Sequence, residues 1–202
     1  MISMGAEDDV RFQRFLTAHH EAAHAVASLM RGGGELLSII IEPTADCLGY
    51  TGFRTALCAS GDRMFVTLAG PWAEARARWP LSSLDGEDAD GGTFDDYLAA
   101  ALLASSDGDS QAYEAVRTDE REMEIRTAQL SGITVSEFRQ RQELAWGREL
   151  EGSWNVIQDV ANMLLDGHTV TATDVRQLVD TVRTGSAEQV GYNRCHDTNG
   201  CP

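Results

Sequence analysis

Two histidines and a glutamate in the segment His19-His20-Glu21-Ala22-Ala23-His24 are the residues of this sequence best placed to carry out chemistry. His20 and His24 are four residues apart, so on a helix both imidazoles leave the same face and can share one metal ion. Glu21 is rotated by about 100° from His20, which lets it contact a metal-bound water without ligating the metal. The pattern predicts Zn2+ on His20 and His24, with Glu21 as a general base that passes a proton from water to a leaving amine.

The third ligand must come from another part of the chain, because His19 points about 100° away from His20 and is expected to be a core residue or to contact a ligand. The metzincin pattern is excluded, since Ala27 and Met30 stand where that class has Gly and His. The thermolysin type takes a Glu from a later helix. Glu42 is near the required distance but lies in a predicted strand, which makes it a poor candidate.

Hydrophobic periodicity predicts the elements that must position these residues. Apolar residues recur at helical spacing, which predicts helices over 12–30, 62–77, 95–105, 111–130 and 136–165. Two runs with strand character, 36–42 and 49–55, predict an antiparallel pair. Thr171 and Asp174 form the pattern of a capping box for a last helix to about 182. The predicted fold class is mainly α, a helical domain with a small antiparallel β-sheet beside the helix that carries His20 and His24.

Length and composition indicate one globular domain, because 202 residues with 43% hydrophobic content can bury a core. We expect an N-terminal extension over 1–11, the domain over 12–183 and a flexible tail over 184–202. The tail contains Cys195 and Cys201, which could form a disulfide or hold a metal but are more simply part of a mobile end.

Charge and hydropathy narrow the expected partners and location. The net charge of −16 repels phosphate groups, so we expect no nucleic acid and no anionic membrane as partner. The longest apolar run, 36–41, is far shorter than a membrane span. With four cysteines and no dense disulfide framework, a cytoplasmic location is expected.

Several further segments stand in a definite order after the histidine motif. They are the strand 38–43, Leu48-Gly49-Tyr50-Thr51, Gly70-Pro71-Trp72-Ala73-Glu74, Gly92-Thr93-Phe94-Asp95-Asp96-Tyr97-Leu98 and the helical region 150–179. Together, over about residues 12–182, they resemble the peptidase domain of FtsH-type AAA+ zinc metalloproteases. The sequence departs from that family at Ala23, where the family has Gly. It departs again at Pro71 and Trp72, where the family has a basic and a small residue.

The resemblance implies roles for individual residues. It implies His20, His24 and Asp96 as zinc ligands and Glu21 as the base. It also implies Glu74 as a carboxylate that orients a ligand. The segment Gly49, Tyr50 and Thr51 is implied to be an edge strand on which an extended substrate lies.

Two other acidic residues compete with Asp96 as the third ligand: Glu74, which lies on a helix next to small residues and has a side chain longer by one methylene, and the adjacent Asp95. Helical phase favours Asp95, which shares a stripe with Leu98 and Leu102. The family register instead selects Asp96, the residue four after Gly92.

These observations predict a zinc-dependent metalloendopeptidase that cleaves unfolded or extended polypeptides. The chain has no Lys and therefore no GxxxxGK[ST] phosphate loop, so we expect hydrolysis that does not depend on ATP. A homo-oligomer, or a separate ATPase or adaptor, is a possible partner. The alternatives are a non-proteolytic regulatory or binding module that retains the fold, and a zinc amidase acting on a small substrate.

Overall fold

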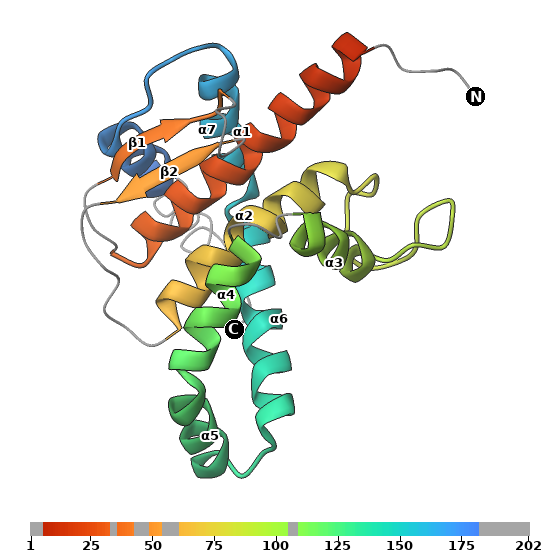
Figure 1. The fold of residues 1–202 in the computed structure, drawn as a ribbon, viewed down its shortest axis with the longest axis vertical. Coiled ribbons are helices and arrows are strands. Elements are labelled where there is room, and N and C mark those ends of the chain that lie inside the picture. The colour runs from red at the N-terminus through yellow and green to blue at the C-terminus, as the bar shows by residue number, and fades with distance from the viewer. Residues whose placement is uncertain (1–5, 33–35, 43–48, 54–60, 105–108, 182–202) are drawn as a thin grey trace, which may run out of the picture.

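The computed structural model describes residues 6–32, 36–42, 49–53, 61–104 and 109–181, and within them the chain is mainly helical (Figure 1). A two-stranded antiparallel sheet lies beside the first helix, as the sequence predicted. The elements are α1 (Ala6–Met30), β1 (Leu36–Ile40), β2 (Tyr50–Phe53), α2 (Asp62–Arg78), α3 (Phe94–Ala104), α4 (Asp109–Asp119), α5 (Arg121–Leu130), α6 (Val135–Gly152) and α7 (Trp154–Leu165). Residues 172–181 form a further helix.

Helix α1 begins at Ala6, six residues earlier than the periodicity predicted, so part of the expected extension 1–11 is helical. Its first turn carries Glu7, Asp8 and Asp9, whose negative charges are favourable at a helix N-terminus. Its end at Met30 is where the apolar spacing predicted it. Gly32 has a positive φ of 67°, and its N–H donates to the carbonyl of Leu29 at 3.2 Å.

The core forms where α1, α2 and α7 pack together. Ala18, Ala22 and Ala25 are fully buried, and side chains this small let neighbouring elements approach α1 closely. The largest fully buried side chains include Trp72 and Phe65 of α2. The helix that carries the histidine motif is therefore held in the centre of the domain.

The sheet pairs Ser38 with Gly52, Ile39 with Thr51 and Ile40 with Tyr50. The antiparallel pairing predicted for the two runs with strand character is thus confirmed for the described residues, while residues 54 and 55 of the second run lie outside them. Both strands contact α1, which places β2 beside the histidine motif (Figure 1).

Two helices predicted as continuous are each broken in two. The region 111–130 is interrupted at Glu120, whose carboxylate accepts a hydrogen bond from the N–H of Gly61 at 2.8 Å. The region 136–165 is interrupted at Ser153, whose hydroxyl donates to the carbonyl of Glu149 at 3.1 Å and contacts the sulfur of Met30. Both breaks occur where a side chain bonds a distant part of the fold, which helical periodicity cannot register.

In Figure 1, α5 lies at the end of the molecule farthest from the sheet. The chain reaches α5 through α4 and leaves it through α6.

The capping box predicted for the last helix is confirmed. Asp174 accepts hydrogen bonds from the N–H of Thr171 at 2.8 Å and from its hydroxyl at 2.6 Å. The predicted tail 184–202, with Cys195 and Cys201, lies outside the described residues. Within the part of the chain that is described, every helix is too short or too polar to cross a membrane.

Candidate metal and catalytic site

The imidazoles of His20 and His24 lie together on one side of α1 and face α2. Their ring centroids are 4.8 Å apart, and the ring planes are inclined by 75°. A methyl group placed on Gly70 of α2 would lie 2.5 Å from Nε2 of His20 and closer still to Nε2 of His24. Both Nε2 atoms therefore converge on one point above the backbone of Gly70, and a glycine is required there because any larger residue would occupy that point.

The other nitrogen of each ring is oriented by a hydrogen-bond acceptor. Nδ1 of His24 donates to the carbonyl of Val66 at 2.7 Å. Nδ1 of His20 lies 3.5 Å from a carboxylate oxygen of Glu74. An acceptor at Nδ1 places the ring proton there, so in each neutral ring the lone pair that can bind a metal is on Nε2.

Glu74 lies one turn after Gly70 on α2, which places its carboxylate against His20. Its second oxygen accepts a hydrogen bond from Arg78 at 2.7 Å. Burial raises the pKa of this carboxyl group, but the hydrogen bonds and charges of His20 and Arg78 outweigh burial, and the net effect is a lowered pKa. An ionised Glu74 in this place is suited to hold the His20 ring, the role that the resemblance implied for it.

Glu21 is 6% exposed and is fixed by β2. The hydroxyl of Thr51 donates to Oε2 of Glu21 at 2.6 Å. A methyl group on Gly49 would lie 2.7 Å from Oε1 of the same carboxylate, so Glu21 packs directly against the backbone at residue 49. The structure thus brings the candidate base to the segment that was predicted to be the substrate edge. Tyr50 of that segment is 55% exposed.

Asp96 lies at the start of α3, where its carboxylate is a helix cap. Its Oδ2 accepts hydrogen bonds from the N–H of Thr93 at 2.8 Å and from its hydroxyl at 2.7 Å, and these bonds lower the pKa of Asp96. The side chain is exposed, whereas Glu21 and His24 are buried. Among the described residues no three His, Cys, Asp or Glu side chains form a group that could hold a metal ion. The structure therefore brings His20 and His24 together, with Glu74 against His20 and the carboxylate of Glu21 held by β2, but it does not add Asp96 to them.

Asp95 is exposed as well, and it lines a groove with Leu98 and Leu102, the stripe that helical phase had indicated. His19 is 2% exposed, and its Nδ1 lies 2.9 Å from the carbonyl of Phe15. Its burial makes His19 a core residue, one of its two predicted roles, and the same burial lowers the pKa of its imidazole.

Sequence reasoning missed the contact between Gly70 and the two imidazoles. It also missed the hydrogen bond from His24 to the carbonyl of Val66 and the hydrogen bond from Arg78 to Glu74. A signal for Gly70 existed, because a glycine directly before Pro71 in a helix interior lowers helix propensity and so needs a packing reason. No local signal marks Val66, since its contribution is a backbone carbonyl.

Comparison of the sequence with profiles of known protein families and with curated proteins gave no match. The geometry of the histidine pair and the patterns in the sequence are therefore the basis for a functional proposal.

Proposed function

We propose that this chain is a zinc-dependent metalloendopeptidase that hydrolyses peptide bonds of unfolded or extended polypeptides. The observation that carries the proposal is the convergence of Nε2 of His20 and Nε2 of His24 above Gly70, with the carboxylate of Glu21 on the adjacent helical position. A purely structural pair of histidines has no need for two rings oriented to one point.

The two imidazoles present the donor atoms that a zinc ion prefers, whereas the third ligand is not among the residues that the structure brings to them. Imidazole nitrogens are preferred zinc ligands, and acceptors at both Nδ1 atoms favour the tautomer that binds through Nε2. His20 and His24 would hold the ion, and we propose Asp96 as the third ligand. When bound, zinc would polarise the scissile carbonyl and lower the pKa of a water molecule.

Glu21 supplies the proton transfers in this proposal. Its carboxylate takes a proton from the attacking water as the new C–O bond forms, and it gives that proton to the amide nitrogen as the C–N bond breaks. The products are a carboxylic acid and an amine, so no other reactant is needed. Thr51 holds Oε2 of the carboxylate in place. The backbone of 49–51, next to the base, is suited to align an extended substrate by main-chain hydrogen bonds.

Metal analysis of the purified protein, together with cleavage of casein with and without a chelator, tests the proposal. We expect about one zinc per chain and cleavage that is lost on chelation and restored by zinc. Cleavage that the chelator leaves unchanged, or a protein that does not bind zinc, would contradict the proposal. Zinc binding without cleavage would favour the non-proteolytic module.

Thr51→Val removes the hydroxyl that holds Glu21 while keeping the shape of the side chain. We expect kcat to fall about tenfold or more with little change in KM, because hydrogen bonds to charged groups contribute about 1.5–3 kcal/mol. Thr51→Ser should restore most of the rate. The matched control is Thr118→Val, since the Thr118 hydroxyl donates only to the carbonyl of Glu114 on the surface of α4. Equal rates for Thr51→Val and the unmodified protein would remove Thr51 from the site.

Asp96→Asn tests the third ligand. We expect zinc affinity to fall by about an order of magnitude or more, because a negative charge is lost beside a divalent ion. Asp95→Asn should bind zinc normally. Asp174→Asn is the matched control, since Asp174 makes the same capping bonds to Thr171 that Asp96 makes to Thr93.

Competition with a chromogenic chelator measures zinc affinity in these variants, and thermal unfolding measures the cost of the changed cap. If Asp96→Asn resembles Asp174→Asn in both measurements, Asp96 is a cap and not a ligand. If Asp95→Asn alone loses the metal, the register inferred from the resemblance is wrong by one residue.

A further inference from the structure

A groove lies across α2 from the histidine pair. Leu68 and Trp72 of α2 line it, and they are rotated by about 200° around the helix from Gly70 and Glu74. It is an open groove of about 910 Å³. Its remaining walls come from α3, from the loop that follows α2 and from α6.

The floor of this groove is apolar. Leu98 and Leu102 of α3 and Leu144 of α6 face Leu68 and Trp72 of α2. Leu144 is 56% exposed. Leu68 and Trp72 are buried at the base of the groove, so its apolar contact with solvent comes from the half-buried Leu98 and Leu102 and from Leu144.

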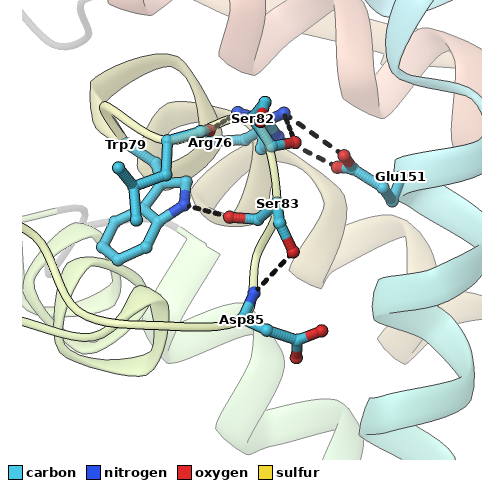
Figure 2. A network of polar contacts seen from close by, with 7 residues as sticks. Arg76, Trp79, Ser82, Ser83, Asp85 and Glu151 are labelled. Carbon is cyan, nitrogen blue, oxygen red and sulfur yellow. Dashed lines mark hydrogen bonds and ion pairs between the residues drawn. The ribbon is translucent and has the colours of Figure 1, made fainter.

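One wall of the groove is fixed by the polar network in Figure 2. The guanidinium of Arg76 binds both carboxylate oxygens of Glu151, at 2.9 and 3.2 Å, and also the carbonyls of Leu81 and Ser82, each at 3.3 Å. The indole N–H of Trp79 donates to the carbonyl of Ser83 at 2.8 Å. These bonds hold the loop after α2 against α6, so the groove is formed before any ligand binds, which reduces the cost of binding.

Acidic side chains surround the apolar floor. Asp85 lies on the loop, Asp95 on α3 and Glu143 on α6, whereas Glu151 of α6 is already paired with Arg76, and Arg148 is the basic residue among those that line the groove. The N–H of Asp85 donates to the Ser83 hydroxyl, and Figure 2 shows its carboxylate turned away from the loop. Negative charge on three walls of one groove favours a positively charged occupant.

We infer that this groove binds a basic amphipathic helical segment of another protein. The apolar floor would receive the leucine or methionine stripe of such a segment, and the carboxylates on the walls would contact arginines or lysines that flank the stripe. The groove is open to solvent rather than enclosed, which suits a segment of a protein better than a small molecule buried on most sides. The net charge of −16 would also steer a basic segment to this chain.

The probe is a panel of helical peptides of about 16 residues that share one leucine stripe and differ in net charge from about +6 to about −6. Fluorescence anisotropy with the full chain measures their affinity. We expect affinity to rise steadily with positive charge and to fall as salt is added. Absence of binding by the most basic peptide up to about 1 mM, or equal binding by the most acidic one, would overturn the inference.

Two exposed leucines provide matched variants. Leu144→Glu places a charge in the groove, while Leu103→Glu makes the same change at a residue of α3 that is 77% exposed and does not line it. We expect Leu144→Glu to weaken the basic peptide about tenfold or more and Leu103→Glu to change it less than about twofold. Equal effects of the two variants would overturn the assignment of the site.

Charge variants test the walls independently of the floor. Asp85→Arg combined with Asp95→Arg should weaken the most basic peptide about tenfold or more, whereas Asp159→Arg, at an exposed position of α7, should leave it within about threefold. Light scattering of the chain alone provides a last control. A dimer that Leu144→Glu dissociates would assign the groove to a second copy of this chain and overturn the inference of a basic partner.

Discussion

Glu21→Gln should lower kcat/KM for an unfolded protein substrate by about 10²–10⁴-fold while zinc content and folding stay unchanged. The amide cannot take a proton from water, so the chemical step loses its base. The amide oxygen can still accept the hydrogen bond that the Thr51 hydroxyl donates to Oε2 at 2.6 Å, and the imidazoles of His20 and His24 are untouched. The measurement is the initial rate of casein cleavage on protein of known zinc content.

Glu114→Gln is the control for that substitution. Glu114 is an exposed residue of α4 whose carboxylate pairs with Arg117 at 3.0 Å, so the same chemical change there should leave the rate within about twofold. If Glu21→Gln keeps more than about a tenth of the activity, Glu21 is not the base and the proposed mechanism fails.

Gly70→Ala is expected to have the second largest effect. The added methyl group would meet Nε2 of both His20 and His24 at 2.5 Å or less, so the rings or α2 must shift. Forced overpacking of this kind costs about 1–3 kcal/mol of stability. Because the displaced atoms are the proposed metal-binding atoms, we also expect zinc affinity to fall about tenfold or more.

Gly147→Ala separates crowding from helix propensity. Gly147 is inside α6, and a methyl group there would lie 3.7 Å from the indole nitrogen of Trp72, an ordinary contact. This substitution should raise stability by about 0.5–1 kcal/mol and leave zinc binding unchanged. Zinc titration and thermal unfolding of both variants complete the comparison. Normal zinc affinity in Gly70→Ala would show that the convergence above Gly70 is not the metal site.

The sequence was sufficient to predict the elements whose signals are local. The apolar spacing around His20 and His24 predicted α1, and alternation predicted the pairing of β1 with β2. The capping pattern at Thr171 and Asp174 predicted the start of the last helix. Each of these patterns reflects a preference within a few consecutive residues, which is why it can be found without the fold.

The helix breaks could not be predicted, because they depend on contacts between distant segments. Glu120 bonds the backbone of Gly61, and Ser153 contacts Met30 of α1. Continuous helical periodicity across both positions therefore predicted single helices. The same limit applies to the site. The spacing of His20 and His24 predicted a shared face, but only the fold places Gly70 against both rings.

All four tryptophans of the chain lie in α6, in α7, in α2 or directly after α2. The Trp72 ring is 6.0 Å from that of Trp154 and 5.8 Å from that of Phe94, and Trp79 is 6.0 Å from Phe94. Intrinsic fluorescence excited at the indole band will therefore report the surroundings of α2, the helix that contacts the histidine pair on one face and the groove on the other. A red shift of that emission marks the opening of this core, and it allows the unfolding of the Gly70 variant to be followed without a label.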